Sequence, residues 1–259
     1  MPTVAAILGS AHDAPRLGPV ELEPRSVSTP YGTVELHRFP RGEGEAWVLF
    51  RHGLPHRYLP HQIPLRAQAA ALKAVGCEAL LVTSSVGILD PALPLDTPLL
   101  VRDLLMLDNR LPDGTPCTMF LEPGPGQGHL VLQEGLFSPA LSRQVADLLQ
   151  RPDAPRVLFA HVPGPRTKTS AENAVLGRLG AQVNSMTLGP EVVLANELEI
   201  PTAGLVVGHK HSRPDHPTLA SHTIAATLQR SRDLLEQPVL AWLRHGRPVP
   251  FGNQLYRFG

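Results

Sequence analysis

The strongest constraint on the fold is a regular alternation of short apolar runs with segments of helical spacing. The runs have the length and composition of buried strands, and they cover residues 3–8, 33–38, 46–51, 78–85, 99–107, 156–162, 182–186 and 202–208. Helices are predicted at residues 63–76, 138–150, 170–180, 191–199 and 219–245, the last of them bent or broken near Pro238. The alternation predicts an α/β fold, a single domain with a central mixed, mainly parallel β-sheet flanked by helices.

Charge and cysteine content limit the class of protein. The 259 residues suffice for one large domain, and 23 Lys and Arg balance 23 Asp and Glu. That balance argues against a general polyanion-binding protein, although one local basic pocket stays compatible with it. Cys77 and Cys117 imply no disulfide framework, and Cys77 is expected to be a small buried thiol. Because neither a signal peptide nor a bilayer-spanning run is recognisable, we expect a cytoplasmic protein with no nucleic-acid or membrane partner.

Four predicted strand exits carry small or polar residues, and ligands gather at such exits in α/β sheets. They are Gly9-Ser10-Ala11, Arg51-His52-Gly53, Thr83-Ser84-Ser85 and Met186-Thr187. An arginine offers a planar pair of donors, and hydroxyls and backbone N–H groups add single donors. Each exit alone is weak evidence, but the ordered set predicts a binding site for an anion the size of phosphate.

The run VVGHKHSRPDH at residues 206–216 places His209, Lys210 and His211 just after an apolar strand that Gly208 is predicted to end. A metal site, an anion site and a solvated turn would all fit this pattern. A His-x-His pair can chelate a metal, but Asp215 is the one acidic residue close in sequence, so no metal site is predicted.

Several motifs together resemble the trimeric purine nucleoside phosphorylase and 5'-methylthioadenosine phosphorylase family over nearly the whole chain. The matching pieces are ILGSA (7–11), STPYG (28–32), FRHGLPH through SSVGIL (50–89) and VPGPRTKT through LANE (162–197). RHGxxH and the Gly-Pro-Arg turn are closer to the methylthioadenosine branch. The resemblance implies a pentosyltransferase that forms a homotrimer. Its domain would span residues 1–246, and a divergent tail at 247–259 would pack on the protein's own surface or on a partner.

The resemblance assigns the anion site to inorganic phosphate, which would act as co-substrate without any other cofactor. The residues implied to bind phosphate are Ser10, Arg51, His52, Ser84, Ser85 and Thr187, with Met186 and Ser85 against the ribose. The implied reaction is attack of phosphate on the anomeric carbon of a purine (deoxy)nucleoside or 5'-methylthio-nucleoside. The products would be free base and ribose 1-phosphate.

The departures from the family lie where the base would bind. Lys168 stands where the family has Glu or Ser, and Lys210 stands where it has Asn or Asp. Ser212 replaces a second acid of the family. With His209 they form the predicted base-binding set. A lysine only donates hydrogen bonds, so N7 and a 6-oxo group suit it better than the 6-amino group of adenine. Three alternatives stay open. The lysines could hold an anionic leaving group that is not a purine, the chain could bind a nucleoside-like or phosphorylated ligand without turnover, or it could catalyse another ribosyl transfer.

Charged neighbours of these residues are assigned structural roles. Glu172 and Glu191 are expected to cap helices or tie loops, and Arg166 to form an ion pair rather than bind phosphate. His56 is either a direct ligand or a loop histidine.

Overall fold

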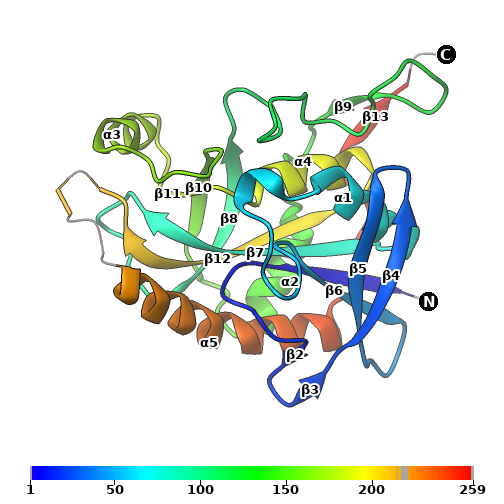
Figure 1. Cartoon of the computed structure of the whole chain (residues 1–259), viewed down its shortest axis with the longest axis horizontal. Coiled ribbons are helices and arrows are strands. Elements are labelled where there is room, and N and C mark those ends of the chain that lie inside the picture. Colours follow the sequence, from blue (N-terminus) through cyan, green and yellow to red (C-terminus); the bar gives the residue numbers. More distant parts are fainter. Residues whose placement is uncertain (1, 214, 217–220, 258–259) are drawn as a thin grey trace.

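A nine-stranded sheet forms the centre of the computed structural model, which describes residues 2–213, 215–216 and 221–257 (Figure 1). In that part of the chain the strand order is β11-β10-β8-β12-β7-β1-β6-β5-β4. The strands are β1 (Thr3–Leu8), β4 (Glu23–Thr29), β5 (Gly32–Phe39), β6 (Glu45–Phe50), β7 (Ala79–Ile88), β8 (Pro98–Leu105), β10 (Arg156–His161), β11 (Val183–Ser185) and β12 (Thr202–His211).

The sheet is mixed, as predicted, and its parallel core brings the functional strand ends together. β6, β1, β7 and β12 are consecutive parallel neighbours, so their carboxyl ends open on one edge. β8 also pairs in parallel with β10, and β10 with β11, whereas β8 is antiparallel to β12. β11 returns antiparallel to the end of β7, so β7, β12, β8, β10 and β11 form a closed ring of pairings.

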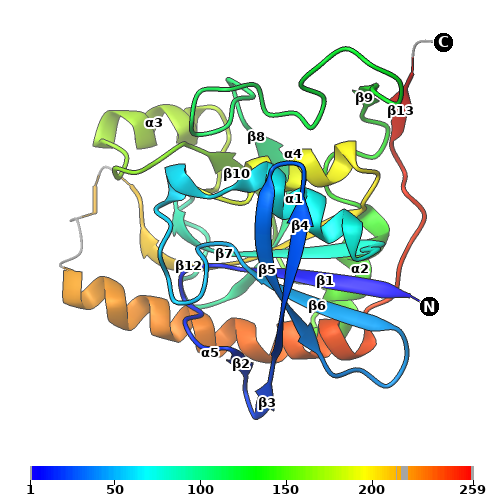
Figure 2. The same ribbon diagram turned by 45° about the vertical axis from the view of Figure 1, so that its right-hand side comes forward.

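Helices cover both faces of the sheet, and the two-residue period of the strands explains how (Figures 1 and 2). α1 (Leu65–Ala74) and α4 (Gly189–Glu197) lie on one face, and α2 (Pro139–Leu148) and α5 (Ser221–His245) on the other. In β1, Ala5 and Ile7 belong to the core cluster that includes α1 and α4 residues, while Val4, Ala6 and Leu8 belong to the α2 and α5 cluster. α3 (Ser170–Arg178) lies beyond β10 and β11. Cys77, in the first cluster, is a free buried thiol, as predicted, and Cys117 is also free and buried.

Sequence predictions about the ends of two strands were wrong. β7, which was expected to end at Ser85, continues to Ile88, so Ser84 and Ser85 lie inside it. β12 does not stop at Gly208 but continues to His211, because the longer β7 supplies pairing partners up to Ile88. The pairing register shifts between Gly208 and Lys210, so the chain bulges where the histidines begin. The predicted alternative of a break at Pro238 was also wrong, since α5 runs continuously through it, and Leu235 and Val239 on either side belong to one core cluster. Residues 219 and 220 of that predicted helix lie outside the described residues. No helix in the described part of the chain is long and apolar enough to cross a bilayer.

Several elements were missed because they are short or exposed. They are β2 (Arg16–Leu17), β3 (Val20–Glu21), β4, the single-turn helix η1 (Pro60–Gln62), β9 (His129–Val131) and β13 (Gln254–Tyr256). β13 pairs with β9, so this part of the C-terminal tail packs on its own chain. Asn253 anchors it, accepting hydrogen bonds from the backbone N–H groups of Gln133 and Glu134 and donating to the Gly135 carbonyl at 2.7 Å.

Candidate active site

The four predicted strand exits meet at one cavity of about 300 Å³. β1, β6 and β7 deliver their carboxyl ends to it, and the β11–α4 connection and the extended end of β12 complete its walls. Among the residues predicted for the site, those lining the cavity are Ser10, Arg51, His52, Ser84, Ser85, Lys168, Met186, Thr187, His209 and Lys210. Ser212 is the one predicted residue that does not line this cavity.

Arg51 is the central cation of one end of the cavity. Its side chain is only 1% exposed, and its Nε donates to Glu191 Oε1 at 2.6 Å. Its Nη1 donates to Thr187 Oγ1 at 3.2 Å, whereas Nη2 has no hydrogen-bond partner among the described residues. A Cβ at Gly9 would lie 3.2 Å from Nη1, so the absence of a side chain there lets the guanidinium approach the end of β1. Arg51 therefore combines a fixed orientation with an unused donor.

A group of hydroxyls lies beside this guanidinium. Ser84 Oγ is 3.3 Å from Ser185 Oγ and 3.4 Å from Thr187 Oγ1. Thr187 precedes Leu188, the N-cap residue of α4, and Glu191 in the first turn accepts from the backbone N–H of Leu188. The same Glu191 carboxylate therefore orients both Arg51 and the start of α4. A guanidinium, several hydroxyls and a helix N-terminus together make an anion-binding environment.

His52 contributes to this end as a neutral ring. Its Nδ1 lies 2.8 Å from the carbonyl oxygen of Tyr58, and because a carbonyl only accepts, Nδ1 carries the proton. Nε2 is then a hydrogen-bond acceptor. Burial, and after it the charge of Arg51, lowers the pKa of His52 to about 4, so the ring stays neutral at pH 7. His56 stacks on it with ring centroids 4.4 Å apart and also lines the cavity.

The opposite end of the cavity carries two lysines. Lys210 lies on the extension of β12 and pairs with Gly87, and Lys168 lies in the loop that leads into α3. Among the described residues, neither ammonium group has a hydrogen bond or an ion pair. Burial, followed by repulsion from Lys210, lowers the pKa of Lys168 to about 8, and burial also lowers that of Lys210.

His209 lies on β12, and its side chain contacts Thr227 of α5 and provides a second neutral ring. Its Nδ1 lies 3.1 Å from Thr227 Oγ1, and that hydroxyl already donates to the Ile224 carbonyl. Nδ1 of His209 must therefore be the donor, and Nε2 is left as an acceptor. Burial first, and then the two lysines, lower the pKa of His209 to about 4.

Ser212 does not share this cavity. Its Oγ would lie 2.0 Å from a Cβ at Gly87, so the serine packs over that glycine. It lines a smaller adjoining cavity of about 110 Å³, together with Arg213 and His216. Lys168 and Lys210 line both cavities. Because β12 runs on past Gly208, Ser212 lies beyond the strand and on the far side of the lysines.

The cavity also contains residues that sequence reasoning did not select. They are Asn184 and Ser185 of β11, Leu59, Pro60 and Leu228. The Asn-Ser pair just before Met186 is a polar strand exit, so a signal was present for it. Leu59, Pro60 and Leu228 carried no signal, because apolar residues in a loop or on a helix resemble packing residues.

The predicted structural roles are confirmed for three charged residues. Glu172 and Thr169 form a capping box at the start of α3, and Arg166 donates to both carboxylate oxygens of Glu172 at 2.8 and 2.7 Å. These hydrogen bonds, that of Arg166 first, hold the pKa of Glu172 at about 2. Glu191 likewise caps α4 and pairs with Arg51.

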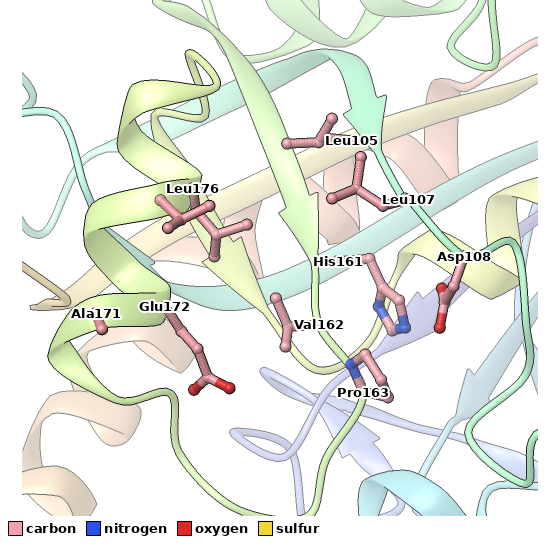
Figure 3. A pocket seen from close by; sticks show the side chains of 10 residues that line it. Leu105, Leu107, Asp108, His161, Val162, Pro163, Ala171, Glu172 and Leu176 are labelled. Carbon is pink, nitrogen blue, oxygen red and sulfur yellow. The ribbon is translucent and has the colours of Figure 1, made fainter.

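A larger cavity of about 460 Å³ lies between β10 and α3 (Figure 3). Its walls are mainly aliphatic, and its ionisable residues are Asp108, Glu172 and His161. The His161 ring donates from Nδ1 to the Thr187 carbonyl at 3.4 Å, and burial lowers its pKa to about 4. The described lining of this cavity has two carboxylates and no lysine or arginine, so it does not suit phosphate, and the smaller cavity is the candidate active site. Among the described residues no three His, Cys, Asp or Glu side chains are placed to hold a metal ion.

Comparison with known proteins defines the class. The chain matches the phosphorylase superfamily over residues 3–241. It is 30% identical over 249 residues to the 6-oxopurine nucleoside phosphorylase of Pyrococcus furiosus, covering 91% of this chain and 90% of that protein. It is 33% identical over 209 residues to a probable S-methyl-5'-thioinosine phosphorylase of Pseudomonas syringae, covering 79% and 83%.

Solved structures agree on the fold. The methylthioadenosine phosphorylase of Schistosoma mansoni in complex with adenine superimposes with a TM-score of 0.78 at 22% identity, covering 94% of this chain and 91% of that one. The protein is thus a member of the phosphorylase superfamily. Within it, the chain belongs to the purine nucleoside and methylthioadenosine phosphorylase family and is a pentosyltransferase.

Proposed function

We propose that this enzyme cleaves the N-glycosidic bond of a purine nucleoside or its 5'-methylthio analogue with inorganic phosphate, preferring 6-oxopurines to adenine. The observation that carries the proposal is the division of one cavity into two cationic ends. Arg51 and hydroxyls form one end, and Lys168 and Lys210 form the other. No cofactor besides phosphate is required for this chemistry.

The arginine end offers both donors and an acceptor, as hydrogenphosphate requires. The free Nη2 of Arg51 and the hydroxyls of Ser10, Ser84, Ser85 and Thr187 would donate to phosphate oxygens. Nε2 of His52 would accept from the single P–OH, because Nδ1 of that ring is already the donor to Tyr58. Met186 and Ser85 would lie against the ribose between the two ends.

The reaction follows from this placement. A phosphate oxygen attacks the anomeric carbon as the bond from that carbon to the base nitrogen breaks, and the bonding electrons leave with the base. Positive charge builds on the sugar in the transition state, so a phosphate dianion held next to it lowers the barrier. Negative charge builds on the base, and donors at the far end of the cavity stabilise it. The products are the free base and ribose 1-phosphate.

The base preference comes from the donors and acceptors at the lysine end. An ammonium group donates to N7 and to a 6-oxo group but cannot accept from a 6-amino group. His209 Nε2 would supply an acceptor for the N1–H of a 6-oxopurine, a ring donor that adenine lacks. Among the relatives, the 6-oxopurine nucleoside phosphorylase of Pyrococcus furiosus supports a 6-oxo substrate.

The test is base release from inosine, guanosine, adenosine, methylthioadenosine and methylthioinosine, each with and without phosphate. We expect phosphate-dependent release, with 6-oxopurines ahead of adenine. Arg51→Ala should abolish turnover. Arg57→Ala is the matched control, because that exposed arginine lies outside the cavity, and it should retain activity. If ligands bind in a thermal-shift assay but none is cleaved, the chain is a binding protein and the proposal fails.

We further propose that the enzyme works as a homotrimer in the cytoplasm. Resemblance to the trimeric family supports the assembly. Light scattering coupled to size-exclusion chromatography would test it, and a monomer at working concentration would refute it.

A further inference from the structure

We infer that the base pocket selects a purine that carries a negative charge, namely a 2,6-dioxopurine nucleoside that ionises close to neutral pH. This inference rests on the proposed phosphorolytic function and narrows its substrate class. It is carried by two unpaired ammonium groups at one end of a cavity that has no carboxylate in its described lining.

The lysines are concentrated at this site. The sequence has only three, Lys73, Lys168 and Lys210, and all its other basic side chains besides histidine are arginines. Lys73 lies on α1, where its Nζ donates to the Leu198 carbonyl at 2.7 Å. The remaining two, far apart in the sequence, converge on the same cavity wall.

The pair is electrostatically unfavourable without a ligand. Each ammonium group is half-buried and repels the other, and Glu172, which attracts Lys168, is held by Arg166 outside the cavity. A neutral oxo group needs one donor, which an uncharged amide could supply without this repulsion. Two like charges in one pocket are stabilising only when an anion lies between them.

The positive region extends beyond the main cavity. The adjoining cavity shares both lysines and adds Arg213, His216 and Ser212, and its described lining also has no carboxylate. Arg213 is itself paired with Asp215, so the two lysines are the unpaired cations there. A base with a second oxo group, which spreads its negative charge toward this side, matches the field better than a neutral one.

The substrate pair that isolates charge is xanthosine and guanosine, because the two differ only in the substituent at C2 and the ring charge that it brings. Hydrogen bonds to charged groups are roughly twice as strong as neutral ones, so we expect kcat/KM for xanthosine to exceed that for guanosine by about tenfold. Lys168→Met and Lys210→Met should each reduce this ratio toward one. Lys73→Met is the matched control and should leave it unchanged.

A binding measurement separates the inference from catalysis. Reductive methylation with a ¹³C label keeps the lysine charge and gives one NMR signal per lysine, assigned through the three Lys→Met variants. Xanthine should shift the Lys168 and Lys210 signals at lower concentration than hypoxanthine does, and leave the Lys73 signal in place.

The outcomes are distinct. If guanosine and inosine are cleaved with phosphate at least as well as xanthosine, the inference fails and the proposed function stands. If no nucleoside is cleaved, the proposed function fails. Equal binding of xanthine and hypoxanthine would overturn the inference whatever the activity.

Discussion

The buried pair of Arg51 and Glu191 allows a prediction in which the double substitution costs less stability than either single substitution. The two side chains are 1% and 3% exposed, and Arg51 Nε lies 2.6 Å from Glu191 Oε1. Removing one partner leaves an uncompensated buried charge, which costs about 3–5 kcal/mol of the free energy of unfolding. Glu191→Leu should lie at the upper end, because the Leu188 N–H also loses its acceptor. Arg51→Met should cost about 3 kcal/mol.

The double variant Arg51→Met/Glu191→Leu removes both charges and replaces them with apolar groups of similar length. Such replacements are often neutral or stabilising, so what remains is the unpaired Leu188 N–H and a lost bond to Thr187, about 1–3 kcal/mol. The double variant should therefore be more stable than either single variant.

Urea unfolding followed by circular dichroism at one fixed protein concentration would measure this. A double variant less stable than both singles, with additive costs, would show that the two charges are not each other's partners. Phosphate at 100 times its Kd should stabilise the wild type by about 2.7 kcal/mol and leave the Arg51→Met variant unchanged.

Three further predictions concern the helices, the core and pH. Ser138→Ala removes the cap of α2 and should cost about 1 kcal/mol in urea unfolding. Gly204→Ala places a Cβ 2.8 Å from Val101 Cβ in the core and should cost about 1–3 kcal/mol in urea unfolding. An unchanged free energy of unfolding would show instead that the strand shifts to make room. Lys168 is charged below its pKa of about 8, so any preference for an anionic base should fall as pH rises through 8. Lys210 lowers that pKa and Glu172 raises it, and His209 is neutral throughout. Because the folded state holds fewer protons on Lys168 than the unfolded chain between pH 8 and 10.5, the free energy of unfolding should rise across that interval. Lys168→Met should remove the rise.

The arginine end of the site could be predicted from sequence because its geometry follows from topology. Ser10 and Arg51 each follow an apolar strand, Ser84 lies in the carboxyl half of β7, and the carboxyl ends of parallel neighbours necessarily share one edge. The order of those strands was not needed for that prediction. Thr187 joined them because β11 and α4 return to the same edge.

The lysine end could be predicted only in part. The nearness of Lys168 to Lys210 depends on the loop before α3, whose course no local pattern specifies. Ser212 was misplaced for a different reason, because the strand was expected to end at Gly208. In the structure the bulge after Gly208 and continued pairing with β7 carry the chain further, which moves Ser212 into the adjoining cavity. Nearest-neighbour propensity contains no information about such pairing.

The two ends of the cavity differ in how deeply their residues are buried in the fold. The arginine end rests on buried strand ends and on one ion pair shared with α4, so substitutions there are expected to cost folding stability as well. The other end rests on the loop at residues 165–169 and the last residues of β12, which are exposed or half-buried. In an enzyme built this way, we expect substitutions at the lysine end to cost less folding stability than substitutions at the arginine end. For protein engineering, these two short segments are the places to substitute residues in order to change the base specificity.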